Sequence, residues 1–217
     1  MRTSGYAVLL LLAACRPDPG ESDYANQGPG TPSGGGTDPS EEVLPGPFPY
    51  QTGQRRLGVG FYEGGRSEDI PVDNVTTHVY LYENTTTMEP STTRVEGRAS
   101  DLVVHAGKAW LGLGVHWDAP RNLDAWKTLH VSLRSSDPGF AQVKVGMNDA
   151  DKKSVQLDVE KYGYVNDGAW HHLAIPLTEF TAGGLRLSAV NAPFVLIAGS
   201  GTAADKLLLD NLYFTAE

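Results

Sequence analysis

The feature that most limits the fold of this chain is an alternation of apolar and polar residues with a period of two. In the stretch Ala141–Asn148, Val143, Val145 and Met147 alternate with polar residues or glycine, and Ser154–Glu160 repeats the pattern. Such alternation places every second side chain on one face of a β-strand. No window shows a helical stripe longer than about two turns. The sequence therefore predicts strands that bury one face.

A cluster of turn-forming residues, Asn148–Lys153, separates these two stretches, so we predict that they pair as a β-hairpin. Leu123–Trp126 is predicted as one short helical turn. Further strands are expected wherever similar stretches lie between segments rich in Gly, Pro, Asp and Asn. These are Thr77–Glu83, Trp110–Trp117, Thr128–Ser135, Trp170–Ile175, Phe194–Ala198 and Lys206–Phe214. Many short strands joined by turns indicate an all-β fold, an antiparallel β-sandwich.

The N-terminus holds the only cysteine of the chain at the end of an apolar run. Arg2 precedes Tyr6–Leu12, and two alanines stand directly before Cys15. A basic start, an apolar core and small residues are typical of a secretory signal peptide. The run is shorter than the roughly 20 apolar residues that a membrane-spanning helix needs. An ordinary signal peptide with an incidental cysteine is one interpretation.

These first 15 residues also resemble the bacterial lipobox. The resemblance implies that residues 1–14 are removed and that Cys15 becomes an acylated N-terminus, which makes the protein a membrane-anchored lipoprotein of the cell envelope. Arg16 stands where some inner-membrane lipoproteins carry an aspartate, so the resemblance favours the outer membrane.

Residues 15–54 have the composition of a tether. Proline and glycine recur throughout, carboxylates are frequent, and Arg16 is the only basic residue. Few apolar side chains are available to offset the entropy of folding, so we expect a disordered linker rather than a buried extended segment. Residues 55–217 then form one domain, long enough to bury a full core.

The net charge of −9 limits the partners of this protein. Nucleic-acid binding needs a basic surface, and so does adhesion to anionic lipid, so we expect no nucleic acid and a membrane attachment through acyl chains alone. If Cys15 is acylated, the domain has no thiol for a disulfide, a cysteine-based zinc site or a cysteine nucleophile.

Three stretches of the second half, Leu123–Leu133, Asp167–Phe180 and Leu207–Phe214, carry motifs in a recognisable order. They are similar to strand motifs of jelly-roll, galactose-binding-like carbohydrate-binding modules, and the likeness covers about residues 123–217. The resemblance implies a non-catalytic domain that binds polysaccharide. It also implies a structural calcium ion between the first and last strands, with Glu83 and Asp210 as candidate ligands.

Sugar binding of this kind would use aromatic rings against pyranose faces and polar side chains for the hydroxyl groups. The predicted surface joins the polar face of the hairpin to aromatic residues of an earlier strand. Its residues are Trp110, His116, Trp117, Gln142, Lys144 and Asn148, with Gln156 and Asp158 beside them. Tyr162 and Tyr164 would share a face if that stretch is extended, whereas Trp126 and Trp170 are expected in the core. For each aromatic residue a purely structural role is the alternative.

No catalytic constellation emerges from the sequence. Gly199-Ser200-Gly201 lacks the spacing of a nucleophile elbow. His171 and His172 are adjacent on a predicted strand, so their rings would point to opposite faces. We therefore expect a binding protein and not an enzyme. A surface module that holds a protein partner is the alternative, and a small glycoside hydrolase with a close carboxylate pair is less favoured.

Overall fold

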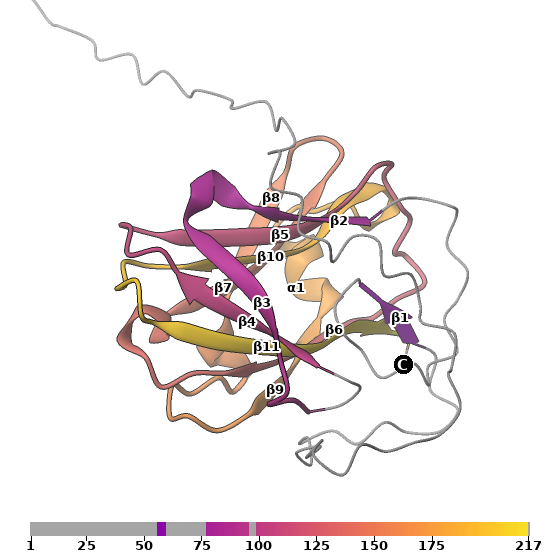
Figure 1. Cartoon of the computed structure of the whole chain (residues 1–217). Helices are drawn as coiled ribbons and strands as arrows, with labels where there is room; N and C mark the ends of the chain where they lie inside the picture. The colour runs from indigo at the N-terminus through magenta and orange to yellow at the C-terminus, as the bar shows by residue number, and fades with distance from the viewer. Residues whose placement is uncertain (1–55, 60–76, 96–98, 217) are drawn as a thin grey trace, which may run out of the picture.

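The computed structural model describes residues 56–59, 77–95 and 99–216, and these form two antiparallel sheets packed as layers (Figure 1). The predicted signal peptide, Cys15 and the tether lie outside the described residues. The six-stranded sheet contains, in order, β3 (Thr86–Ser91), β4 (Ser100–His105), β11 (Lys206–Thr215), β6 (Thr128–Arg134) and β9 (His171–Pro176), with β1 (Arg56–Gly58) paired to β11. The five-stranded sheet contains β2 (Thr77–Leu81), β5 (Leu111–Trp117), β10 (Val190–Ala198), β7 (Val143–Asp149) and β8 (Ser154–Asp158).

The core lies between the inner faces of the two sheets. Val143, Val145 and Met147 of β7 are fully buried, as the alternation predicts, and they join one apolar cluster with Leu129 and Val131 of β6. Each sheet therefore has an inner apolar face and an outer, more polar face. The predicted antiparallel β-sandwich is confirmed.

The predicted hairpin is also present. Strands β7 and β8 pair antiparallel, with Lys144 opposite Asp158 and Asn148 opposite Ser154. The turn between them is closed by Asp149, whose carboxylate accepts hydrogen bonds from the backbone N–H groups of residues 151 and 153. All eight predicted strands correspond to strands of the structure, with ends that differ by a few residues.

Strands β3 and β4 are not evident from the sequence pattern. In β4 the positions that face inward alternate between apolar and polar residues, because Val103 lies between the buried Asp101 and His105. In β3, Glu89 and Pro90 interrupt the apolar positions of an edge strand, where proline is tolerated. The buried Asp101 and His105 therefore conceal β4 from its hydrophobic periodicity, and the exposed Glu89 and Pro90 do the same for β3.

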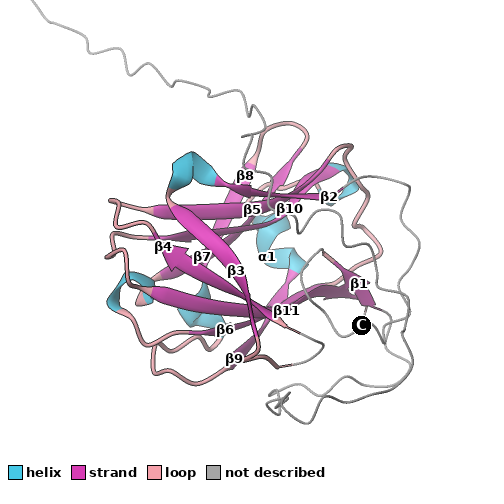
Figure 2. Cartoon of the chain, viewed as in Figure 1, coloured by secondary structure: helices cyan, strands magenta, loops and turns pink. Residues whose placement is uncertain are grey.

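Helical structure is sparse (Figure 2). The helix α1 (Leu177–Ala182) begins directly after Pro176 ends β9, and single 3₁₀ turns occupy Tyr82–Asn84, Pro138–Phe140, Val159–Tyr162 and Leu187–Ala189. Leu123–Trp126 is a hydrogen-bonded turn, in which Trp126 N–H donates to the Leu123 carbonyl at 2.9 Å, and not a helical element. No helix among the described residues is long and apolar enough to cross a membrane.

Candidate functional site

The outer face of the five-stranded sheet carries rows of facing residues that cross its strands. One row passes over all of the strands, and a second begins at β5. The first is Tyr80, Gly114, Val195, Gly146 and Gln156, and the second is Gly112, Ile197, Lys144 and Asp158. Their neighbours along each strand, such as Leu113 and Val145, lie in the core, so these rows face outward. In these rows the glycines leave β5 and the centre of β7 without side chains on either side of Val195 and Ile197 of β10.

Two aromatic rings lie against this glycine floor at the β5 side. A β-carbon built on Gly112 would stand only 2.5 Å from Cζ3 of Trp110 and 2.7 Å from Cδ2 of Tyr82, and one on Gly114 would overlap the Tyr82 hydroxyl. Only glycine at these two positions lets the rings approach the sheet so closely. The half-buried Trp110 and Tyr82 therefore form an aromatic ledge over β5.

His116 continues this aromatic group along β5. Its Nε2 is hydrogen-bonded to the Tyr82 hydroxyl at 2.7 Å, and its ring lies edge-on to Tyr80 at 4.8 Å between centroids. Burial, and then the charge of the facing His78, lower the pKa of His116 to about 4. The ring is therefore neutral at neutral pH. His78 is held by Asp118, with 2.7 Å between Nε2 and Oδ1.

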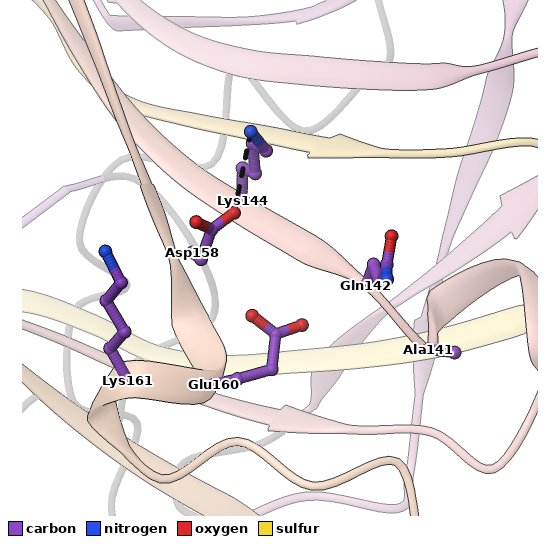
Figure 3. Close-up of a pocket in the computed structure, with 6 residues that line it drawn as sticks. All are labelled: Ala141, Gln142, Lys144, Asp158, Glu160 and Lys161. Carbon is purple, nitrogen blue, oxygen red and sulfur yellow. Dashed lines mark ion pairs between the residues drawn. The ribbon is translucent and has the colours of Figure 1, made fainter.

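The opposite side of the same face is hollowed into an open depression of about 570 Å³ at the base of the hairpin (Figure 3). It is lined by Ala141, Gln142, Lys144, Asp158, Glu160 and Lys161. Lys144 Nζ lies 3.5 Å from Asp158 Oδ1, and Glu160 Oε1 accepts a hydrogen bond from the Val143 N–H. Two cations and two anions line the depression, so their formal charges cancel.

Two amide oxygens near this face are buried without a hydrogen bond to any described residue. They are the Oδ1 atoms of Asn148 in β7 and Asn191 in β10. Asn148 is directly opposite Ala192, the neighbour of Asn191, where β10 departs from regular register. A buried carbonyl oxygen without a donor is costly, but because both atoms are covered, a ligand on the face does not reach them in this conformation.

The structure brings most of the predicted binding residues to this one face. Trp110 and His116 belong to the aromatic group, Gln142 and Lys144 line the depression, and Asn148 lies nearby on β7. The sequence analysis missed His78, Tyr80 and Tyr82. The signal was present, because all three occupy the alternate positions of Thr77–Glu83 that face away from Val79 and Leu81.

Trp117 is a correction to the predicted surface. Its side chain is only 5% exposed and belongs to the core, where Leu111, Leu113 and Val115 precede it at the same alternate positions. Its ring is covered on one side by Arg121, whose Cζ lies 4.6 Å from the ring centroid. Trp117 is therefore not available as a stacking platform.

The other aromatic predictions have mixed outcomes. Tyr162 and Tyr164 do not share an extended face, because Tyr162 ends a 3₁₀ turn and Tyr164 is buried, with its hydroxyl donating to the Phe140 carbonyl at 2.9 Å. Trp126 is in the core, as expected, whereas Trp170 is only half-buried.

The two predicted calcium ligands do not share a site. Asp210 lies beside Asp101, whereas the exposed Glu83 is in the turn before Thr86, which pairs with His105 at the other end of β4, four residues or about 13 Å from Asp101. Asp210 already accepts hydrogen bonds from the N–H groups of Val95 and Asn211. No cluster of three or more His, Cys, Asp or Glu side chains suited to a metal occurs among the described residues. Calcium binding stays a prediction.

The outer face of the six-stranded sheet carries a series of polar side chains that are hydrogen-bonded to one another rather than available to a ligand. Thr215, His130, His172, Ser132 and Asn211 are linked in this order by hydrogen bonds of 3.0 Å. Ser132 is fully buried, so no substrate can reach its hydroxyl. The adjacent ring of His171 points away and pairs with Asp167, so the two histidines face opposite sides, as predicted.

Comparisons with known proteins agree with this fold. The sequence model of a family described as Carbohydrate binding domain 30 matches residues 52–216. Among solved structures, a family 30 carbohydrate-binding module is similar with a TM-score of 0.51 at 12% identity, over 75% of this chain and 99% of that one. This likeness supports the fold. A search of curated proteins found no match.

Two further solved structures are similar at a lower level. A family 11 carbohydrate-binding module of a cellulosomal cellulase of Clostridium thermocellum has a TM-score of 0.46 at 11% identity, over 76% of this chain and 95% of that one. The extra C-terminal domain of an exo-1,3/1,4-beta-glucanase from a Pseudoalteromonas species has a TM-score of 0.46 at 14% identity, over 66% and 87% of the two chains.

Proposed function

The chain belongs to the carbohydrate binding domain 30 family, and on this premise we propose that it binds a polysaccharide along the outer face of its five-stranded sheet. The carbohydrate-binding class follows from the family. The surface, the polymeric ligand and the place of the protein in the cell are our proposals.

The observation that carries the proposal is the row that joins the aromatic ledge to the depression. Trp110 and Tyr82 cover Gly112 at one end, Ile197 follows, and the ion pair of Lys144 with Asp158 stands at the other end. From β5 to β8 the row crosses three inter-strand spacings, about 14 Å. Aromatic rings suit the apolar faces of sugars, and polar groups suit their hydroxyls, so the row offers both along one line.

The composition of the surface favours a glycan over a protein partner. Among the described residues, Val165 alone is a large hydrophobic side chain with a strongly exposed surface. Protein-binding sites are usually marked by contiguous exposed apolar patches, which this part of the chain lacks. The family and fold also support a binding domain without catalytic activity. The close carboxylates Asp101 and Asp210 are buried rather than placed in a cleft, which supports the same view.

We further propose that the sandwich is held at the bacterial cell envelope, and by preference at the outer membrane, through acyl chains on Cys15. The lipobox resemblance and the acidic, proline- and glycine-rich residues 15–54 support this proposal. Two or three acyl chains hold a protein firmly, because each buried methylene contributes about 0.8 kcal/mol. The acyl chains would then hold the binding domain at the membrane, and the length of the tether would set its distance from the membrane surface.

Affinity gels containing plant, capsular or envelope polysaccharides test the proposed binding. The full chain should be retarded by at least one of them, and Trp110→Ala or Gln142→Ala should reduce this retardation. Glu89→Ala is the matched control, since Glu89 is exposed on β3 of the other sheet. A chain that no polysaccharide retards would refute the function. Equal losses in all three variants would refute the location.

A further inference from the structure

Tyr82 occupies an unusual position on the proposed sugar-binding face. It follows β2 directly and begins the 3₁₀ turn Tyr82–Asn84, in which Glu83 and Asn84 both have positive φ angles, of 50° and 52°. This left-handed pair reverses the chain toward β3 in the other sheet. The ring of Tyr82 is left behind on the outer face of β5, against Gly112 and Gly114.

The backbone of Tyr82 is fastened to β5 by the fully buried Thr85. The Thr85 N–H and hydroxyl both donate to the Tyr82 carbonyl, at 2.9 and 2.7 Å. The Thr85 hydroxyl oxygen also accepts a hydrogen bond from the Gly112 N–H at 3.0 Å. One threonine thereby joins the turn to the same strand on which the tyrosine ring lies.

The far end of the ring is fastened by His116. The Tyr82 hydroxyl is hydrogen-bonded to His116 Nε2 at 2.7 Å, and the two rings are nearly perpendicular, at 87°. His116 comes from β5 itself, two residues after Gly114. Tyr82 is thus held at its carbonyl, along its ring and at its hydroxyl, all by β5 or by Thr85.

We propose that Tyr82 is a preorganised platform on which a sugar ring of the polysaccharide stacks, and that His116 is the residue that positions it. This inference rests on the proposed function. A side chain fixed before binding loses little rotamer freedom when the ligand arrives, so the three contacts raise the affinity without touching the ligand. His116 and Gly114 act through Tyr82, whereas Tyr82 touches the sugar.

The test measures affinity for the polysaccharide that the wild-type chain binds, by calorimetry or gel retardation, with the unfolding midpoint recorded for every variant. Tyr82→Ala should lower the affinity at least tenfold, because it removes the platform. Tyr82→Phe keeps the ring and loses its anchor, and should lower the affinity about threefold to tenfold. Tyr162→Phe is the matched control, a half-buried tyrosine that packs against the core and does not line the depression, and it should bind as the wild type.

The positioning role is tested by a double-mutant cycle and by rescue. His116→Ala should weaken binding about as much as Tyr82→Phe, and the double variant should be no worse than His116→Ala alone. His116→Gln supplies another hydrogen-bonding group and should restore most of the affinity. Restoration of affinity at an unchanged unfolding midpoint distinguishes positioning from a general structural role.

A glycine pair gives an independent test. Gly114→Ala places a methyl group where the Tyr82 hydroxyl lies, and should weaken binding as Tyr82→Phe does. Gly199→Ala is its control, because no described atom lies within 4 Å of a β-carbon there. Wild-type affinity in Tyr82→Ala overturns the platform, and additive losses in the cycle overturn the positioning role of His116. If the wild-type chain itself binds no polysaccharide, it is the proposed function that fails.

Discussion

The carboxyl group of Asp101 is buried beside that of Asp210, where β4 pairs with β11. Burial, and then the charge of Asp210, raise the pKa of Asp101 to about 8. Its Oδ2 atom is buried without a hydrogen bond to any described residue, whereas both oxygens of Asp210 accept backbone N–H groups. Asp101 is therefore protonated at neutral pH, and the pair shares a single negative charge.

The first prediction concerns the pH dependence of stability. Because the folded-state pKa of Asp101 lies above its ordinary value of 3.8, the folded state binds the extra proton. The contribution of Asp101 to the free energy of unfolding is fully present below about pH 3.8. It falls by about 1.4 kcal/mol per pH unit as the pH rises and is lost above about pH 8. Urea unfolding from about pH 5 to 8, in EDTA, should show the unfolding free energy of the wild type falling at this slope relative to that of Asp101→Asn, because the opposite contribution of His116, whose pKa is lowered to about 4, is common to both proteins. Asp124→Asn, at an exposed position, is the control, and equal slopes in all three proteins would contradict the assignment.

The second prediction concerns calcium. If the ion binds at Asp210, calcium should raise the melting temperature of the wild-type chain, and EDTA should reverse the increase. Asp210→Asn keeps an acceptor for the Val95 N–H but removes the charge, and should abolish the response. Glu83→Ala should respond as the wild type, because Glu83 lies far from Asp210. A melting temperature that neither calcium nor EDTA changes would refute calcium binding by this protein.

The third prediction separates affinity from stability in the depression. Lys144 and Asp158 are each about half exposed, so their ion pair contributes at most about 1 kcal/mol to folding. Lys144→Met should therefore leave the urea midpoint nearly unchanged while weakening polysaccharide binding about threefold to tenfold. Arg186→Met breaks a comparably exposed ion pair with Asp151 and should affect neither quantity. Unchanged binding in Lys144→Met would exclude its side chain from the ligand contact.

The fourth prediction concerns the core under the proposed face. Leu113 is fully buried at the centre of β5, between the outward-facing Gly112 and Gly114. Leu113→Ala should lower the free energy of unfolding by about 2–5 kcal/mol, because it removes buried methyl groups and leaves a cavity. Val165→Ala, at an exposed valine, should change it by less than about 0.5 kcal/mol. Chemical denaturation measures both, and a small effect at Leu113 would contradict the packing described.

The fifth prediction concerns the anchor. In a bacterial host that acylates lipoproteins, the wild-type chain should be labelled by a palmitate analogue and should partition into the detergent phase on phase separation in a Triton detergent. Cys15→Ser should abolish both properties, because the chain has no other cysteine. Equal detergent partition of the two proteins would refute the acylation of Cys15.

The local sequence predicted well those strands whose pairing partners are neighbours in the sequence. The β7–β8 hairpin could be predicted because its alternation and its turn residues occupy one continuous stretch. Strand β4 could not, since Asp101 and His105 take inward positions where the pattern expects apolar residues, and in β3 Glu89 and Pro90 interrupt the alternation. The prediction of Trp117 as a surface residue could have been avoided from the sequence. Trp117 lies on the same face of β5 as the alternate residues Leu113 and Val115, and that face is in the core.

Taken alone, the sequence determined that this chain is an all-β sandwich with a lipobox-like N-terminus, because alternation and a short signal are properties of neighbouring residues. Only the tertiary structure decided which residues make the proposed site. Tyr82 meets His116 and Gly114 more than thirty positions away, and Gly112, which Trp110 covers, shares a row with Lys144 only because β10 lies between β5 and β7. Strand order and register are set by packing across the whole sandwich, so no local pattern contains them.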